Sequence, residues 1–369
     1  MMVASLGIAL PEVRQSFAFS EIEAGSLFSV VLMVAAMTST IAGRLADKIG
    51  PKAVLVTGLS LLAVGFSSAG ISGHQVAFFF FFGLTGLGYG FTSPSLYALM
   101  SGLLPNRRGL GASLVSVAYG IGGAIGAVLT SRIIAAVGWR AAFVTVGAIA
   151  AVVMLLQSYW IRNPFHSASA RRFIRLREAF SLPLLILALA EFTGGSVFWS
   201  CAAWMPTLLR TAKALTLQET GWVMGVLSIA NILGSLLLGS LSDQLGRKKV
   251  ILISALPAAA AAFVVFYWLN SAFAIALGIF VFGTLKASVP ALVVALAQET
   301  APSRSAGTAS GVIMSLHYSS GVVAPLIAAQ LITGTGDIIL AMILVSSLPL
   351  IIYGGLIGVV PERRHAEVI

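Results

Sequence analysis

The sequence predicts an all-α integral membrane protein made of two pseudo-symmetric six-helix bundles, with about eleven full transmembrane helices and a partial first helix. Composition is the first reason: 58% of the 369 residues are hydrophobic and only 9% are charged, whereas a soluble domain carries about 25% charged residues. The second reason is a series of uncharged runs of about 20 residues or more, the length that spans a bilayer. The third reason is an internal repeat that divides the chain into two halves.

The repeat is a short stretch that lies between two long apolar runs in each half of the chain. Its copies start at residues 43 and 239 (239 − 43 = 196) and read Gly43-Arg-Leu-Ala-Asp47-Lys48-Ile-Gly50-Pro51-Lys52 and Gly239-Ser-Leu-Ser-Asp243-Gln244-Leu-Gly246-Arg247-Lys248-Lys249. The flanks keep this spacing, since Ser20 and Glu23 correspond to Thr216 and Glu219, and Arg108 and Gly111 to Arg304 and Gly307. The first of these pairs is a capping-box pattern, which opens a helix. A duplicated membrane unit explains the repeat better than chance.

The positions of the cations predict the orientation in the membrane. Most of the 22 lysines and arginines fall in alternate loops, on one side of the predicted spans. The exceptions are Arg14, Arg140, Arg210 and Lys213, which fall on the other side, and Arg132 and Lys286, which lie within spans. This bias is the positive-inside rule, so we expect both termini in the cytoplasm of a cell whose inner (plasma) membrane holds the chain. The net charge of +10 therefore needs no nucleic acid as a partner.

The first half is expected to comprise residues 1–161. Residues 1–10 are apolar but span only about 15 Å as a helix, half of a ~30 Å hydrocarbon core, and Pro11 and Glu12 are read as the outer end of this helix. We therefore expect the first helix to be truncated in this sequence. The following spans are predicted at residues 24–43, at two segments within residues 53–106 that break near residues 73–75, and at residues 109–138 and 141–161.

The second half, residues 179–369, repeats the scheme after a cytoplasmic linker at residues 162–178 that is rich in serine and arginine. Its spans are predicted at residues 179–209, 220–242, two within 250–298 that turn near residue 270, 305–336 and 338–361. With a complete first helix, the total would be about twelve spans, the two halves having equal numbers.

The repeated stretch resembles the signature of the major facilitator superfamily, which joins the second and third helices of each six-helix half. The first copy departs from the pattern at Lys48 and Pro51, and the second at Gln244. The resemblance implies that the copies are cytoplasmic latches, in which Asp47 and Asp243 face helix ends with Lys48, Lys52, Arg247 and Lys248 as charge partners. The glycines at Gly43, Gly50, Gly239 and Gly246 belong to the same signature.

The resemblance implies a secondary transporter that opens a site near the middle of the membrane alternately to each side. The residues themselves give no sign of an enzyme, since no phosphate-binding loop, nucleophile–base arrangement or metal-ligand spacing occurs in the sequence. We expect no cofactor and no metal. The expected partners are a small-molecule substrate, the lipid bilayer and protons, and the chain is expected to be a monomer.

Three ionisable residues within spans are the candidate site, because charges inside a membrane are costly and by default functional. Glu191 lies about 16 Å into its helix, while Lys286 and His317 each lie about 20 Å from the cytoplasmic ends of theirs, so all three reach a similar depth. The resemblance puts Glu191 and Lys286 on helices that line the central cavity, with His317 beside them. Further candidates for substrate or coupling contacts are Tyr318, Asn231, Trp199, Tyr89 and Tyr119.

Two interpretations of these residues are open. Lys286 could attract an anionic substrate group while Glu191 or His317 takes up a proton, or Glu191 and Lys286 could form an ion pair that only neutralises two buried charges. For the substrate, the sequence favours a small organic anion or amphipathic metabolite coupled to an ion gradient. The alternatives are multidrug or metabolite efflux by proton antiport and a sensor that has the fold but moves nothing.

Overall fold

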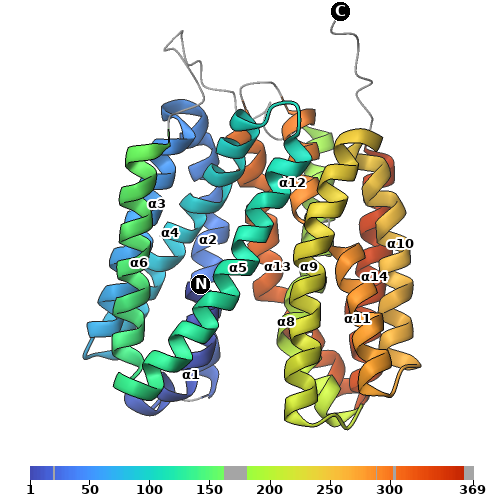
Figure 1. The fold of residues 1–369 in the computed structure, drawn as a ribbon, viewed down its shortest axis with the longest axis horizontal. Helices are drawn as coiled ribbons and strands as arrows, with labels where there is room; N and C mark the ends of the chain where they lie inside the picture. The colour runs from blue at the N-terminus through green and yellow to red at the C-terminus, as the bar shows by residue number, and fades with distance from the viewer. Residues whose placement is uncertain (20, 162–180, 288, 302–304, 361–369) are drawn as a thin grey trace, which may run out of the picture.

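The computed structural model describes residues 1–19, 21–161, 181–287, 289–301 and 305–360 and arranges them as two helical bundles side by side (Figure 1). The N-terminal bundle consists of α1 (Met2–Phe17), α2 (Glu21–Ile49), α3 (Pro51–Ile71), α4 (Gln75–Leu103), α5 (Arg108–Val137) and α6 (Trp139–Trp160). The C-terminal bundle consists of α8 (Leu182–Thr211), α9 (Leu217–Leu245), α10 (Arg247–Tyr267), α11 (Ala272–Lys286), α12 (Ala291–Thr300), α13 (Ala306–Thr335) and α14 (Ile338–Val359). The predicted linker at residues 162–178 lies outside the described residues.

Among the described residues, eleven segments are long and apolar enough to cross a membrane, which confirms the prediction of eleven full spans. Helices α11 and α12 together form one of these segments, residues 272–300, and α1, with 16 residues, is not among them. The apolar side chains that give the spans their hydropathy lie both in the bundle cores and on the outer surface, as expected where lipid takes the place of water.

The largest differences from the predicted helices concern α1 and the span at residues 272–300. Helix α1 does not end near Pro11 but continues to Phe17, whose ring packs at 4.9 Å from Phe78 and 5.9 Å from Trp139. This buried aromatic cluster stabilises the last turns, and membrane helices tolerate an internal proline. The span at residues 272–300 is broken rather than continuous: α11 ends at Lys286, and α12 begins after Pro290, which has no N–H to donate and disfavours a helical residue before it.

The two copies of the repeat adopt the same local geometry. Gly50 precedes α3 with φ 95° and ψ 143°, and Gly246 precedes α10 with φ 93° and ψ 143°, a positive-φ conformation that suits glycine. The predicted capping box is formed in the second half, where Thr216 and Glu219 bond reciprocally at the start of α9. Its counterpart at Ser20 lies outside the described residues.

The face of the molecule that carries the turns at Gly50, at residues 104–107 and at Gly246 is called the basic face below. The two bundles meet toward the basic face and diverge toward the opposite face (Figure 1). Helix α2 packs against α13, and α5 packs against α9. Both crossings use glycines: a Cβ atom on Gly311 would lie 3.0 Å from the Cα of Thr40, and one on Gly239 would lie 3.0 Å from the carbonyl oxygen of Gly109.

Candidate functional site

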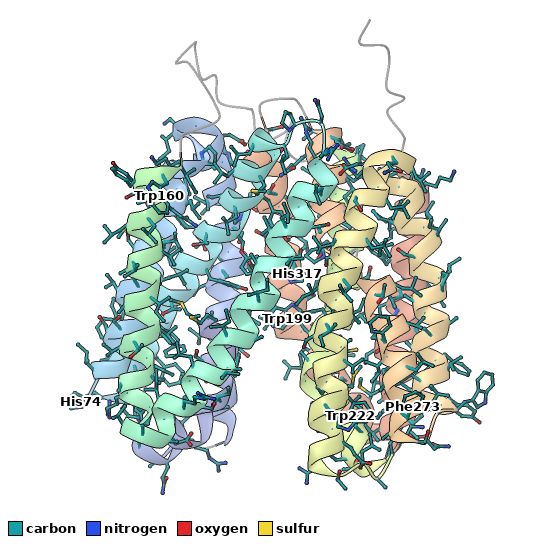
Figure 2. The ribbon with its side chains drawn as sticks, viewed as in Figure 1. His74, Trp160, Trp199, Trp222, Phe273 and His317 are labelled. Atoms are coloured by element: carbon teal, nitrogen blue, oxygen red, sulfur yellow. The ribbon has the colours of Figure 1, made fainter. Side chains whose placement is uncertain are left out.

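The structure brings Glu191 of α8 and His317 of α13 into direct contact. The Nδ1 atom of His317 lies 2.8 Å from Oε1 of Glu191, and the His317 and Glu191 side chains are only 10% and 0% exposed. His317 and Trp199 lie midway between the two faces of the molecule, at the boundary between the bundles (Figure 2). Counting residues along each helix predicted only that Glu191 and His317 lie at a similar depth in the membrane. The structure shows that the two side chains are in contact.

Two side chains bond the backbone carbonyl of His317, beside the Glu191–His317 pair. The indole Nε1 of Trp199 donates to the carbonyl oxygen of His317 at 3.2 Å, and the Ser320 hydroxyl donates to the same oxygen at 2.6 Å. The second carboxylate oxygen of Glu191, Oε2, is buried and has no hydrogen-bond partner among the described residues. One acceptor position at this site is therefore left open.

Lys286 lies at the end of α11, next to the break in that span, and is 4% exposed. Within the described residues, no ion pair joins Lys286 to Glu191, and its ammonium has no hydrogen-bond acceptor. Its Nζ atom lies 4.9 Å from the ring centroid of Phe198. The ion-pair interpretation paired Glu191 with Lys286, whereas in the structure the partner of Glu191 is His317.

Tyrosine and serine hydroxyls connect the two bundles beside this pair. Tyr318 of α13 shares a hydrogen bond with Ser93 of α4, and Ser93 bonds the hydroxyl of Tyr119 on α5 at 2.7 Å. The Tyr89 ring packs against Tyr318 with a centroid distance of 5.2 Å. The three predicted tyrosines thus come together around Ser93, which the sequence analysis did not single out.

The structure does not bring Asn231 into this group. Its amide nitrogen donates to the carbonyl oxygen of Leu227 in the same helix at 2.9 Å, so part of its hydrogen-bonding capacity serves α9 itself.

Phe198 was missed by the sequence analysis. A signal existed, because Phe198 lies seven residues after Glu191, about two helical turns, and therefore on the same face of α8.

Both repeated aspartates contact the N-terminus of a helix in the other bundle. Asp47 accepts hydrogen bonds from the backbone amides of Gly307 and Thr308 at 2.7 Å each, and from the Thr308 hydroxyl, at the start of α13. Asp243 accepts from the backbone amides of Gly109 at 3.1 Å and Leu110 at 3.0 Å, at the start of α5. The free amides and positive dipole end of a helix favour an anion at this position.

The basic residues of the two copies are used differently. Arg247 lies 2.5 Å from Asp243 and 3.1 Å from Glu299, whereas Pro51 occupies the equivalent position in the first copy. Lys248 donates to the carbonyl oxygen of Val360 at 2.7 Å rather than to an acidic side chain. Lys48 is exposed at the end of α2, and Lys52 is half-buried at the start of α3.

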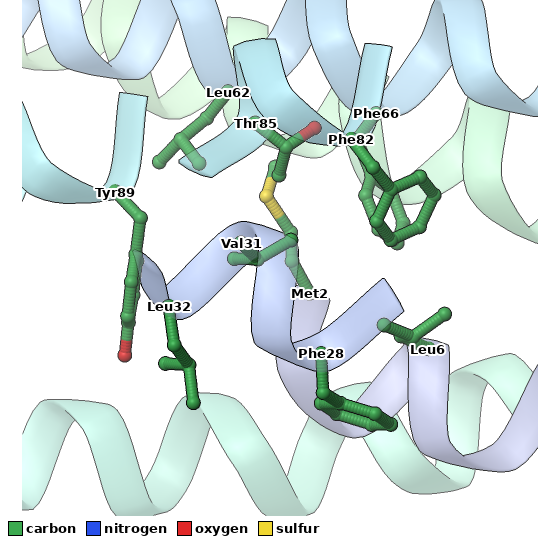
Figure 3. Close-up of a pocket in the computed structure, with 10 residues that line it drawn as sticks. All are labelled: Met2, Leu6, Phe28, Val31, Leu32, Leu62, Phe66, Phe82, Thr85 and Tyr89. Atoms are coloured by element: carbon green, nitrogen blue, oxygen red, sulfur yellow. The ribbon is translucent and has the colours of Figure 1, made fainter. Parts of the chain in front are cut away.

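A mostly apolar pocket lies inside the N-terminal bundle, between α1, α2, α3 and α4 (Figure 3). It is lined by Met2, Leu6, Phe28, Val31, Leu32, Leu62, Phe66, Phe82, Thr85 and Tyr89. Tyr89 links this pocket to the tyrosine cluster, but none of Glu191, Lys286 and His317 lines it.

The paired bundles and the eleven apolar segments among the described residues define a multi-pass helical membrane protein. The family model described as Major Facilitator Superfamily matches residues 1–325. The chain belongs to the major facilitator superfamily, and it is a secondary transporter rather than an enzyme.

Individual relatives are distant but cover most of the chain. It is 23% identical to the probable sulfoacetate transporter SauU of Cupriavidus necator, over 96% of this chain and 87% of that one. It is 25% identical to the 3-(3-hydroxy-phenyl)propionate transporter of Escherichia coli, over 98% of this chain and 90% of that one. Its fold matches a crystal structure of the E. coli fucose:proton symporter FucP with a TM-score of 0.79 at 17% identity, over 97% and 95% of the two chains.

Proposed function

We propose that the protein carries a small organic acid together with protons across the plasma membrane by alternating access. The observation that carries this proposal is Lys286, a residue that is only 4% exposed and whose ammonium has no hydrogen-bond acceptor among the described residues. Burying an ammonium ion costs several kcal/mol. A cation–π contact such as that with Phe198 returns only about 0.5–2 kcal/mol. The carboxylate or sulfonate of a substrate would supply the missing partner.

The Glu191–His317 pair is proposed to bind the coupling proton. A carboxylate that is hydrogen-bonded to an imidazole can take up a proton on either group. The added positive charge then belongs to the pair rather than to one residue. The unpartnered Oε2 of Glu191 is an acceptor already in place. Because Glu191 and Lys286 lie on helices of the same bundle, substrate binding and proton binding can influence each other through the shared electrostatic field.

The relatives support the substrate class. SauU and the hydroxyphenylpropionate transporter are named for organic acids, and FucP is named as a proton symporter. The charge bias of the loops supports a topology in which the basic face and both termini are cytoplasmic. With this orientation, the bundles meet on the cytoplasmic side and diverge on the outer side, as expected for an outward-facing state (Figure 1). We further propose that the chain acts as a monomer.

The two latches, each an aspartate bound to the N-terminus of a helix in the other bundle, are proposed to hold the cytoplasmic side closed. Asp47→Asn and Asp243→Asn remove the charge but keep the size. An interaction between a charge and a helix terminus contributes about 0.3–2 kcal/mol, so each variant should raise the population that is open to the cytoplasm, by up to about 30-fold. Spin labels at positions 106 and 249, with Cys201 replaced by serine, would measure the opening by double electron–electron resonance.

Asp337→Asn is the matched control for the latches. Asp337 accepts from the amides of Ile339 and Leu340 at 2.8 and 3.1 Å, so it caps α14 within its own bundle. Its variant should leave the distance distribution unchanged. An unchanged distribution in the Asp47→Asn, Asp243→Asn double variant would show that the latches do not hold the bundles together.

The proposed function is tested by transport in proteoliposomes that contain the full chain. A panel of radiolabelled small carboxylates and sulfonates is offered, first in counterflow and then with an inward proton gradient. We expect at least one acid to exchange in counterflow and to accumulate when the gradient is applied. Binding without exchange would identify a sensor, and exchange without any effect of the gradient would remove the proton from the proposal.

A further inference from the structure

Phe198 is an exposed ring next to buried polar groups. Its side chain is 41% exposed, yet its ring centroid lies 4.9 Å from Nζ of Lys286, 5.1 Å from the Trp199 ring and 6.1 Å from the His317 ring. Lys286 and His317 belong to α11 and α13, so Phe198 of α8 faces two other helices of its bundle. Both neighbours are almost fully buried and belong to the candidate site, so we infer that the open side of the Phe198 ring borders this site.

A lipid-facing aromatic residue in the same bundle looks different. Phe263 of α10 is 38% exposed, close to the value for Phe198. Its ring contacts among the described residues are with Tyr267 and Trp268, four and five positions further along the chain. The exposed fraction alone therefore does not distinguish the two rings, but their neighbours do.

The geometry points to a substrate that carries a flat ring, an aromatic carboxylate whose anionic group pairs with Lys286 while its ring packs against Phe198. This inference rests on the proposed function and narrows its substrate class. An anion that reaches the Lys286 ammonium is necessarily close to the Phe198 ring, since the two are already in contact. Whatever is attached to that anion then covers the open surface of Phe198, and aromatic pairs favour offset or edge-to-face packing at centroid distances of about 4.5–7 Å.

Aromatic rings continue from Phe198 across the boundary between the bundles. The His317 and Tyr318 rings are 5.6 Å apart, Tyr318 lies 5.2 Å from Tyr89, and Tyr89 lies 6.3 Å from Tyr119. Both bundles thus contribute ring surfaces at the level of the candidate site. A short aliphatic acid would satisfy Lys286 but leave the open surface of Phe198 without a partner.

The test compares two acids that have the same charge and nearly the same size. Binding of phenylacetate and cyclohexylacetate to the purified full chain in lipid nanodiscs is measured by isothermal titration calorimetry. We expect phenylacetate to bind about twofold to tenfold more tightly, which corresponds to the free energy of an aromatic pair interaction beyond area burial. Phe198→Leu keeps an apolar side chain without a ring and should remove this preference while both acids still bind. Phe263→Leu should leave the preference as it is.

The outcomes separate this inference from the proposed function. Equal binding of the two acids by the unchanged protein, with both lost in Lys286→Met, would overturn the aromatic inference and leave the organic-acid site standing. A ring preference that survives Phe198→Leu would also overturn it. If neither acid binds, and a panel of aliphatic carboxylates and sulfonates does not bind either, the proposed function fails together with the inference.

Discussion

Lys286→Met is expected to weaken binding of the proposed organic acid by about 30-fold or more. Truncating one member of a buried charge pair typically costs about 2–5 kcal/mol of binding free energy. Methionine has a similar length and is apolar, so it fills the space at the end of α11 without a charge. Because a buried ion is often replaced by an apolar side chain at no cost, the melting temperature should stay the same or rise.

The measurement for Lys286→Met combines ligand binding with thermal unfolding of the same sample. Lys213→Met is the matched control, because Lys213 is also a mostly buried lysine but donates to Oδ1 of Asn270 at 3.1 Å, away from Glu191 and His317. That variant should bind the acid as the unchanged protein does. Normal acid binding by Lys286→Met would rule out Lys286 as the anion partner.

Glu191→Gln is expected to separate transport from the proton gradient. Glutamine keeps the size of the side chain and an oxygen that can accept from Nδ1 of His317, but it cannot bind and release a proton. A gradient of one pH unit corresponds to about 1.4 kcal/mol, so with one coupled proton the unchanged protein should accumulate acid up to about tenfold. Glu191→Gln should exchange acid in counterflow but bring it only to equal concentrations on the two sides.

Uptake with and without a pH gradient, together with counterflow, measures this separation. Glu219→Gln is the control, since Glu219 bonds Thr216 in its own capping box and lies at the start of α9. This variant should accumulate the acid normally. Gradient-driven accumulation that persists in Glu191→Gln would assign the coupling proton to another group.

Most of the fold follows from the sequence because a bilayer imposes simple limits. Uncharged runs bounded by cations mark the spans, and the repeat at Asp47 and Asp243 marks the two halves. The end of α1 could not be read, since the helix continues past Pro11 through contacts of Phe17 with residues distant in sequence. The break before α12 had a local signal in Pro290. It was overlooked because the residues around it are uncharged, so hydropathy alone does not mark the end of a helix there.

The site was predictable in depth but not in its pairings. Counting residues along each helix places Glu191, Lys286 and His317 at one level, because the rise per residue is fixed. How each helix is rotated about its axis is set by packing, so the sequence could not show that Glu191 faces His317. For the same reason Ser93 was missed, although it links tyrosines from both bundles.

Both latches join an aspartate to main-chain amides, and this has a consequence for how the protein can vary. Any residue except proline offers the amide that Asp47 or Asp243 accepts from, so most substitutions at the tips of α5 and α13 should keep these bonds, although a change at Thr308 would also remove its hydroxyl bond to Asp47. The size of the residue at Gly307 and Gly109 cannot vary in the same way. A methyl group on Gly307 would lie 2.8 Å from Oδ1 of Asp47, and one on Gly109 would lie 2.8 Å from the carbonyl oxygen of Gly239, so either would act as a wedge. In this protein, the close approach of the helices at these glycines limits how tightly the two bundles can meet at the basic face.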